Sequence, residues 1–274
     1  MRGIVFALLL VIPAQAGTSA PPAAAAPSPR ILRVCADPNN LPFSNDKREG
    51  FENKLVDLIA ADLHATVTYT WWAQRRGNVR ETLNAGLCDL IPGVGSNLEM
   101  LGTTRPYYRS TYVAVTRADR HLDIASFDDP RLEALKIGVS MVGDDFNNTP
   151  PAHALAKRGI IDNVRGYMIY GDYAKPEPQA DIVNAVASGE VDIAFVWGPV
   201  GGYFAARSPV PLKVTPLSPH FDGPQLPMVF DVSIGTRKDD RAFHDELESV
   251  LARHSGEVKA LLASYGVPLV EEGP

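Results

Sequence analysis

The sequence predicts an α/β protein with two lobes joined by a hinge that the chain crosses twice. Two successive blocks each alternate β-branched, strand-like segments with amphipathic, helix-like segments, which is the pattern of βαβ units. A lone strand-like segment and a long helical segment close the chain, and they have no sheet of their own to join. With 274 residues, the chain is long enough for two blocks that each bury a core. We therefore expect the last elements to return to the first block and to leave a cleft between the lobes.

Residues 1–16 have the features of a cleavable signal peptide. Arg2 supplies a positive charge, residues 4–12 are all apolar, and small residues follow at the spacing of a cleavage site. The apolar run has about half of the ~20 residues that a membrane-spanning helix needs, which makes a retained anchor the less favoured alternative. Residues 17–30 are rich in Ala, Pro and Ser, which predicts a flexible linker. We expect a periplasmic protein that does not span the membrane.

The first predicted lobe comprises residues 31–116 together with residues 228–270. Leu55, Leu58 and Ile59 recur at helical spacing, while β-branched and aromatic residues mark the strands. Strands are expected at 31–35, 66–71, 89–94, 112–115 and 229–234, and helical segments at 52–63, 78–85 and 239–264. These elements predict one sheet with helices packed against it.

Residues 117–227 form the second predicted lobe, which repeats the alternation. Strands are expected at 136–139, 165–170 and 191–196, and helices at 144–158 and 179–188. The two crossings between the lobes are expected near 116–135 and 217–228, where turn and breaker residues gather. Two such crossings indicate a hinge between the lobes.

The two cysteines, Cys35 and Cys88, are candidates for a disulfide. An exported protein meets an oxidising compartment, and an even number of cysteines favours pairing. The expected positions argue against it, because Cys35 falls near the end of one strand and Cys88 just before another. A disulfide tolerates a Cα separation of only about 4.4–6.8 Å. A disulfide and a pair of small buried side chains therefore both remain open.

Composition and motifs argue against several classes of function. The net charge is -6 and no dense run of Lys and Arg occurs, which excludes a nucleic-acid-binding protein. The six histidines lack the close spacing of a zinc site, and helix capping explains Asp144 and Asp145 without a metal. The glycine-rich run 198–202 lacks the Lys of a phosphate loop, and no hydrolase elbow or catalytic cysteine signature occurs. We expect no metal and no cofactor in this chain.

Five runs of sequence are long and unusual in composition. They are residues 33–43, 50–55, 69–77, 104–112 and 196–199. These runs resemble the MoxJ/XoxJ family, a branch of the periplasmic solute-binding proteins with the type II fold, and the resemblance covers about residues 31–268. It implies a periplasmic accessory of a PQQ-dependent methanol dehydrogenase that assists the maturation or activation of that enzyme. The PQQ would belong to the dehydrogenase, and the cytochrome c of that enzyme is a further candidate partner.

Amino-acid receptors with the type II fold typically hold the substrate carboxylate with an Arg placed after the third strand. Alignment on the preceding strand puts Met100 at that position, and Met carries no positive charge. In the second lobe, the helix start that usually binds the carboxylate is replaced by residues 142–145, where Asp144 and Asp145 would repel an anion. We therefore predict that the cleft is not a standard site for α-amino acids.

The predicted rim of the cleft is rich in aromatic and amide side chains, which offer a large contact area to a flat ligand or to a partner protein. Trp71 and Trp72 are adjacent on a strand, so only one can face the cleft, and a place in the core is the alternative for each aromatic residue. The arginines could guide an acidic partner, with a solvated surface position as the alternative. The candidate binding residues are Asn39, Phe43, Trp72, Gln74, Arg75, Ser96, Arg105, Tyr107, Tyr108, Asp144, Trp197 and Tyr203.

Three functions remain open at this stage. The favoured one is a noncatalytic accessory that docks to the dehydrogenase, with a small molecule in the cleft as a further candidate ligand. The second is the receptor of an ABC transporter for a small solute that is not an α-amino acid. The third is a lyase or hydrolase on the same scaffold, which needs a paired acid and base in the cleft. For that role the sequence offers only the scattered carboxyl groups of Glu52, Glu99, Asp144 and Asp145.

Overall fold

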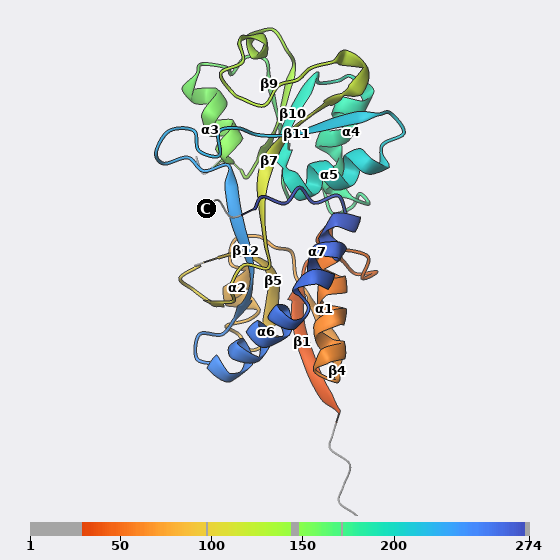
Figure 1. Ribbon diagram of the computed structural model, residues 1–274, viewed down its shortest axis with the longest axis vertical. Helices are drawn as coiled ribbons and strands as arrows, with labels where there is room; N and C mark the ends of the chain where they lie inside the picture. Colours follow the sequence, from red (N-terminus) through yellow and green to blue (C-terminus); the bar gives the residue numbers. More distant parts are fainter. Residues whose placement is uncertain (1–28, 97, 144–147, 171, 272–274) are drawn as a thin grey trace, which may run out of the picture.

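The computed structural model describes residues 29–96, 98–143, 148–170 and 172–271. These residues form two α/β lobes that follow one another along the long axis of the molecule (Figure 1). The α/β architecture that the sequence predicts is confirmed. The predicted signal peptide lies outside the described residues. Within the described part of the chain, none of the helices is long and apolar enough to cross a bilayer.

Lobe 1 is a sheet with helices packed against it. Its strands are β1 (Arg30–Ala36), β4 (Ala65–Trp71), β5 (Leu90–Gly95), β12 (Val229–Thr236) and the short β6 (Gly102–Thr103). Its helices are α1 (Phe51–Asp62), α2 (Asn78–Glu81), α6 (Arg241–Arg253) and α7 (Ser255–Ser264), and a small hairpin of β2 (Asn39–Asn40) and β3 (Ser44–Asn45) precedes α1. Strand β1 runs parallel to both β4 and β5, so the carboxyl ends of the three strands meet at one edge.

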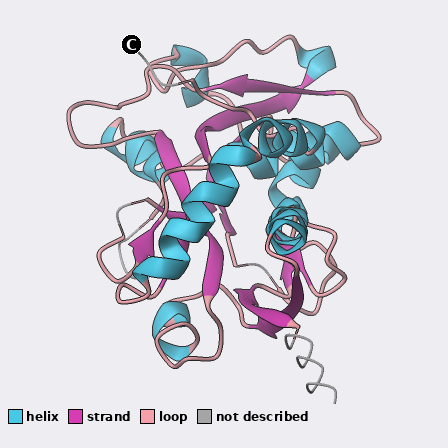
Figure 2. Ribbon diagram, turned by 60° about the horizontal axis from the view of Figure 1, so that its bottom comes forward, coloured by secondary structure: helices cyan, strands magenta, loops and turns pink. Residues whose placement is uncertain are grey.

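Lobe 2 repeats this arrangement. Its strands are β8 (Ile137–Met141), β9 (Val164–Met168), β10 (Ile193–Trp197) and β11 (Leu212–Pro216). Its α-helices are α3 (Pro150–Lys157), α4 (Asp181–Ser188) and α5 (Gly198–Arg207), and single-turn 3-10 helices lie at Ala118–Arg120, Pro130–Glu133 and Pro178–Ala180. Strand β8 runs parallel to β9 and β10, so lobe 2 also has an edge of carboxyl ends. Helices flank the strands of both lobes (Figure 2).

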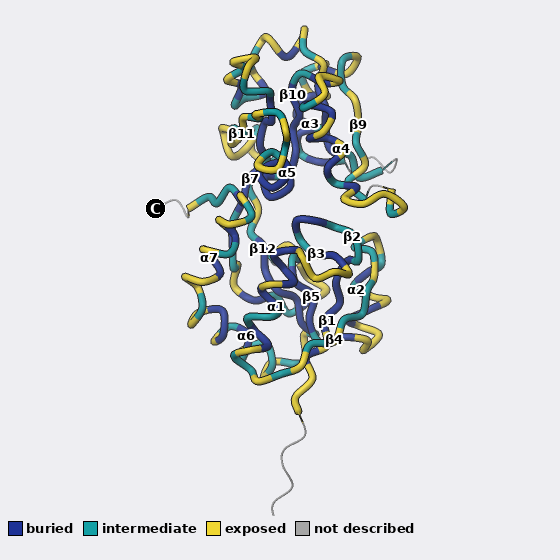
Figure 3. Tube along the Cα trace, turned by 90° about the vertical axis from the view of Figure 1, so that its right-hand side faces the viewer, coloured by how far each residue is buried: buried dark blue, intermediate teal, exposed yellow. Residues whose placement is uncertain are grey.

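Strand β7 (Tyr108–Arg117) belongs to both lobes. Residues 108–111 pair with β12, and residues 112–116 pair with β10. The label of β7 lies where the two lobes meet (Figure 3). One path of strands therefore runs through the molecule in the order β4-β1-β5-β12-β7-β10-β8-β9. The first crossing lies inside β7, earlier than the segment 116–135 that the sequence suggested, because one extended strand serves both sheets. The second crossing leads into β12 from the expected segment 217–228.

The C-terminal helices pack on lobe 1. The Asp240 side chain accepts a hydrogen bond from the Phe243 backbone N–H (3.3 Å) and starts α6, while α7 begins after His254. The helical segment 239–264 of the sequence is therefore two helices. Their apolar faces join the core cluster of α1 and β1, with buried contributions from Leu247, Val250, Val258 and Leu262.

Several elements differ from the sequence prediction. Helix α3 starts at Pro150, because two prolines occupy its first positions, where a missing N–H costs nothing. The predicted start near residue 144 falls on residues 144–147, which lie outside the described part. Helix α2 has one turn only, and β11, which pairs with β7, was not predicted. Short elements of this kind carry too few residues to show a period.

The glycine-rich run 198–202 forms the first half of α5. A Cβ at Gly202 would overlap the carbonyl oxygen of Gly266, and a Cβ at Gly198 would overlap that of Thr111. These glycines therefore let backbones approach closely, which is a packing role rather than a role in binding phosphate.

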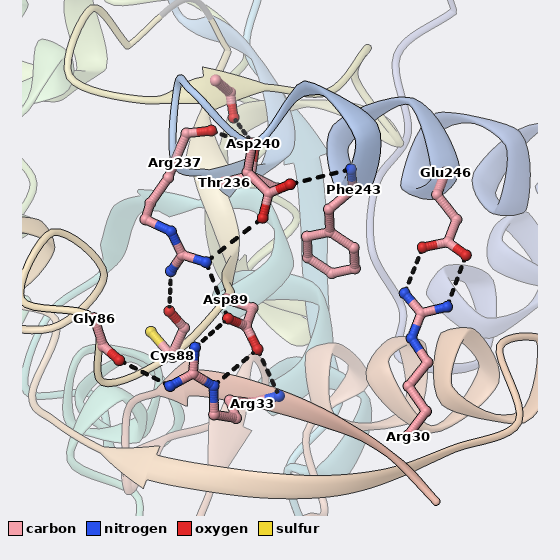
Figure 4. A network of polar contacts seen from close by, with 11 residues as sticks. Arg30, Arg33, Gly86, Cys88, Asp89, Thr236, Arg237, Asp240, Phe243 and Glu246 are labelled. Atoms are coloured by element: carbon pink, nitrogen blue, oxygen red, sulfur yellow. Dashed lines mark hydrogen bonds and ion pairs between the residues drawn. The ribbon is translucent and has the colours of Figure 1, made fainter. Parts of the chain in front are cut away.

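A disulfide joins Cys35 in β1 to Cys88, two residues before β5 begins. The neighbouring parallel strands hold the two Cα atoms 5.6 Å apart, which is within the range that a disulfide tolerates. The expected strand positions of the two cysteines therefore do not prevent the bond. Beside the disulfide, Asp89 accepts hydrogen bonds from Arg33 (3.0 Å) and from Arg237 (3.0 Å), and Arg237 also donates to the carbonyl oxygen of Cys88 (2.6 Å) (Figure 4). The disulfide and these charges tie β1, β5 and the end of β12 together.

Candidate functional site

A cavity of about 550 Å³ lies between the two lobes. Residues at the ends of β1 and β5 line it from lobe 1, and residues that follow β8 and β9 line it from lobe 2. Tyr112 and Phe230, which stand on β7 and β12 where the chain crosses, line it at the hinge. The cavity therefore occupies the cleft that the two-lobed prediction required.

Asp37 follows β1 directly and points its carboxyl group at the cleft. The backbone N–H groups of Asn39 (2.9 Å) and Gln74 (2.7 Å) donate to that carboxyl group, and only 1% of the residue is exposed. The Tyr173 hydroxyl donates to it from lobe 2. Burial, followed by this hydrogen bond, raises the pKa of the Tyr173 hydroxyl above its usual value of 10.0. Asp37 is thus held by three neutral donors.

Amide groups extend this contact between the lobes. The Asn39 side chain donates to the carbonyl oxygen of Lys175 (2.8 Å). The Gln179 side chain donates to the side-chain oxygen of Asn40 (3.0 Å). The side-chain amide of Asn40 in turn donates to the side-chain oxygen of Gln74 (3.3 Å). We call the five residues that meet across the cleft the interlobe latch: Asp37, Asn39, Asn40, Tyr173 and Gln179.

Glu52 lies at the lobe 1 wall of the cavity, in the first turn of α1. It is 2% exposed, and its Oε2 atom has no hydrogen-bond partner. Gly93 on β5 packs against it so closely that a Cβ there would overlap Oε1. Burial, and secondly the charge of Asp37, raises the pKa of the Glu52 carboxyl from 4.5 to about 8.

Aromatic rings cover the hinge side of the cavity. The ring of Tyr112 lies 5.3 Å from that of Trp197 and 6.3 Å from that of Phe230, and Trp197 lies 5.9 Å from Phe230. All three pairs meet edge to face, which is a favourable geometry for aromatic pairs. We call Tyr108, Tyr112, Trp197 and Phe230 the aromatic wall, because all four line the cavity.

The described lining of the cavity contains carboxyl groups but no Lys, Arg or His. Of its three acidic residues, Asp231 makes a two-pronged ion pair with Arg109 (2.7 Å for each contact). Met100, at the position where an Arg clamp was sought, is 51% exposed and is not part of the lining. The described lining therefore offers no side chain that would neutralise a ligand carboxylate.

The structure brings some of the predicted site residues to the cavity. Phe43, Gln74, Tyr108 and Trp197 line it. Asn39 belongs to the interlobe latch, and the guanidinium of Arg75 lies over the Tyr173 ring, 4.8 Å from its centroid.

Other predicted residues do not line the cavity. Trp72 is 43% exposed, and Arg105 pairs with Glu248 on α6 (3.0 Å). Ser96 shares a hydrogen bond with Ser233 (2.5 Å). Tyr107 is covered beside Glu52, and Tyr203 stacks on Tyr265 with 5.7 Å between ring centroids. The remaining predicted residue, Asp144, lies outside the described residues.

These residues differ from the prediction for a physical reason. The prediction assigned every polar or aromatic residue of the rim to one surface, but Tyr203 stands on the inner face of α5 and is only 7% exposed. Its place in the core is the alternative that the sequence left open for each aromatic residue.

Sequence reasoning missed several residues of the cavity. Tyr112, Tyr170, Tyr173, Phe230 and Asp231 line it and were not among the candidates, and neither were Asp37 and Glu52 as binding residues. Asp37 carried a usable signal, because it follows directly on a buried strand whose carboxyl end faces the cleft. Tyr173 carried none, since it stands in a segment between β9 and α4 whose path the sequence does not fix.

Three carboxyl groups, the aromatic wall and the interlobe latch together form a candidate binding site between the lobes. Among the described residues, no group of three or more His, Cys, Asp or Glu side chains could hold a metal ion. The fold and this site define a two-lobed solute-binding protein.

Comparison with known proteins shows to which family of solute-binding proteins the chain belongs. Residues 32–268 match the model for bacterial extracellular solute-binding proteins, family 3, and the chain belongs to this family. Protein MoxJ of Methylorubrum extorquens is 31% identical over 95% of this chain and 90% of its own length. The crystal structure of the periplasmic binding protein XoxJ from Methylobacterium extorquens AM1 is 35% identical, with a TM-score of 0.72 over 88% of this chain and 100% of that one. MxaJ from Methlophaga aminisulfidivorans MPT is 27% identical, with a TM-score of 0.75 over 87% of this chain and 100% of that one.

These similarities confirm the resemblance that the sequence runs indicated. The chain is a homologue of the MoxJ and XoxJ proteins.

Proposed function

We propose that the protein is a noncatalytic periplasmic accessory that docks to a PQQ-dependent methanol dehydrogenase and assists its maturation or activation. The observation that carries the proposal is similarity to MoxJ and XoxJ along almost the whole chain, including both lobes and the hinge. The signal-like N-terminus supports export to the periplasm through a cleavable peptide. The PQQ would be carried by the dehydrogenase, with its cytochrome c as a second candidate partner.

The cavity supports a role outside ordinary amino-acid transport. A free α-amino acid brings a carboxylate, and a buried carboxylate without a partner is costly. The described lining offers no basic side chain to pair with it, and Asp37 adds negative charge. A receptor for free amino acids is therefore the function that the site fits least.

The proposal is tested by mixing the purified mature protein with the methanol dehydrogenase of the same organism. We expect the two to elute together in size-exclusion chromatography, and we expect turnover by freshly assembled dehydrogenase to rise when the protein is present. A family 3 solute-binding protein for amino acids serves as the matched control, because it has the same fold. Separate elution together with unchanged turnover in the apo and the PQQ-loaded enzyme would contradict the proposal.

A second candidate is the receptor of an ABC transporter for a small solute. The cavity of about 550 Å³ between the lobes favours it, because a docking protein does not need a site in the cleft. This function predicts that a gene deletion abolishes uptake of one solute and leaves dehydrogenase activity unchanged. The docking function predicts the reverse.

A further inference from the structure

The cavity carries negative charge that is not balanced by the protein. Asp231 is paired with Arg109, but the described ion pairs include neither Asp37 nor Glu52. Asp37 receives hydrogen bonds from two backbone N–H groups and one hydroxyl, all of them neutral. The positive charge that would balance these two carboxyl groups is therefore absent from the described lining.

Glu52 is a second acidic side chain of the cavity lining, and one of its oxygens lacks a hydrogen-bond partner. A carboxyl group that is 98% buried normally finds donors for both oxygens, yet Oε2 has none. Gly93 supplies the room for the carboxyl group, since any other residue there would displace it. Oε2 itself exposes almost no surface, so a donor on a ligand reaches it only when the Glu52 side chain turns toward the cavity that it lines.

The aromatic wall defines the remainder of the ligand. Ring faces and edges of Tyr108, Tyr112, Trp197 and Phe230 bind hydrocarbon, and the faces also attract a cation through the ring quadrupole. Rings and carboxyl groups together are a combination that binds alkylammonium groups. The same lining disfavours anions, because Asp37 repels them and no basic side chain is present in the described lining.

We propose that the cavity binds a small organic cation that carries no carboxylate, with its ammonium group at Asp37 and Glu52 and its hydrocarbon part on the aromatic wall. This inference does not depend on docking to the dehydrogenase. It concerns the isolated protein, so its failure and the failure of the docking proposal are separate results.

Binding of such a cation releases a proton. In the cavity without a cation, the pKa of Glu52 is about 8, so its carboxyl group is mostly protonated at neutral pH. Among the titratable groups, Asp37 raises this pKa. Tyr107 and Tyr108 also lie near Glu52, but burial raises their own pKa values well above 10.0, so both remain neutral. An ammonium group favours the ionised form of Glu52. Affinity for the cation therefore rises with pH up to about 8 and then levels off.

Isothermal titration with matched pairs of compounds tests the ligand class. 1-Aminopentane is compared with pentanoate, and 1,5-diaminopentane is compared with lysine, which differs from it by the carboxylate alone. We expect both amines to bind and the carboxylate-bearing member of each pair to bind at least about tenfold more weakly. Equal binding within either pair, or no binding of either amine at millimolar concentration, would overturn the proposal.

The substitution Glu52→Gln tests the residue. Gln copies the shape of the protonated carboxyl group but cannot ionise, so amine affinity should fall about tenfold or more at pH 9 and much less at pH 6. Asp57→Asn, an exposed carboxyl group on the same helix, is the matched control and should leave affinity unchanged at both pH values. An equal effect of Glu52→Gln at pH 6 and pH 9 would contradict the assignment.

A measurement on the unaltered protein makes the test independent of how variants fold. Titration of 1,5-diaminopentane at pH 7 in two buffers of different ionisation enthalpy gives the number of protons released. We expect a release that approaches one proton and falls toward zero at pH 9.5. Binding without proton release at pH 7 would show that Glu52 does not hold the cation.

Discussion

At the scale of single residues, Gly93 leaves the space that the buried carboxyl group of Glu52 occupies. Gly93 has a φ of +72°, a conformation that side chains rarely adopt, and its Cα faces the carboxyl group of Glu52. The absence of a side chain on β5 is what allows an acid to be buried at the start of α1. The site therefore depends on a residue that contributes no chemistry.

We predict that Gly93→Ala destabilises the protein strongly. The positive φ alone costs about 1–2 kcal/mol, and the overlap with Glu52 raises the loss in the free energy of unfolding to about 3 kcal/mol or more. Gly86→Ala is the control, because Gly86 also has a positive φ of +76° but has nothing within 4 Å of the added Cβ. Urea denaturation of both variants measures the difference, and equal losses would show that Glu52 moves aside freely.

The raised pKa of Glu52 predicts how stability depends on pH. Between pH 4.5 and about 8 the folded protein keeps a proton that the unfolded chain has lost, so this group makes the folded state less stable as pH rises. The slope is at most about 1.4 kcal/mol per pH unit. Stability of Glu52→Gln should match that of the wild type near pH 4.5 and exceed it at pH 9. Denaturation midpoints of both proteins at several pH values test this prediction. The same difference in midpoint between the wild type and Glu52→Gln at every pH would contradict it.

At the scale of elements, the disulfide fixes the spacing of β1 and β5. Asp37 follows β1 directly and Gly93 lies on β5, so the relative position of the two strands sets the acidic side of the cavity. Both cysteines are fully buried in a small apolar cluster on lobe 1. The disulfide therefore supports the site without taking part in it.

We predict that Cys35→Ala with Cys88→Ala lowers the free energy of unfolding by about 4 kcal/mol, because the bond closes a loop with a sequence separation of 53. The fold should persist at 25 °C, since the Arg33, Asp89 and Arg237 contacts remain. Chemical denaturation under oxidising conditions measures the loss. A midpoint equal to that of the wild type would mean that the unfolded chain is already restricted.

At the scale of the whole molecule, two sets of contacts act on the hinge. The segment after α7 joins both lobes, because Ser110 of β7 donates to the carbonyl oxygen of Pro268 (2.6 Å) and Tyr265 stacks on Tyr203 of α5. The interlobe latch also joins the lobes, by hydrogen bonds across the cleft. We therefore expect opening of the cleft to break the latch.

We predict that Tyr173→Phe shifts the molecule toward an open form. The lost hydrogen bond to a charged group is worth about 2 kcal/mol, which is a change of roughly thirtyfold in the ratio of closed to open molecules. Small-angle scattering should show a larger radius of gyration. Tyr167→Phe is the control, because its hydroxyl contacts Glu190 within lobe 2 (3.3 Å). An unchanged radius for Tyr173→Phe would show that the other latch contacts suffice.

Much of the architecture could be predicted because it rests on local patterns. Strands such as β1 and β4 carry β-branched residues along one short run, and the lone strand near residue 230 needed a partner sheet, which β5 and β7 provide. The site could be predicted less well. Phe43 and Trp197 were predicted correctly because they are large aromatic residues near strand ends. Tyr203 is also a large aromatic residue, but it faces the core.

The sequence by itself determined the α/β class and the two-lobed architecture, because each depends on residue type and on order along the chain. Only the tertiary structure decided that Glu52 is buried without a partner, that Tyr173 reaches Asp37 and that the cysteines meet. The physical reason is that burial, pKa and contact between distant residues depend on which surfaces pack together. That packing joins segments more than 100 residues apart, such as Asp37 and Tyr173, and no local pattern records it.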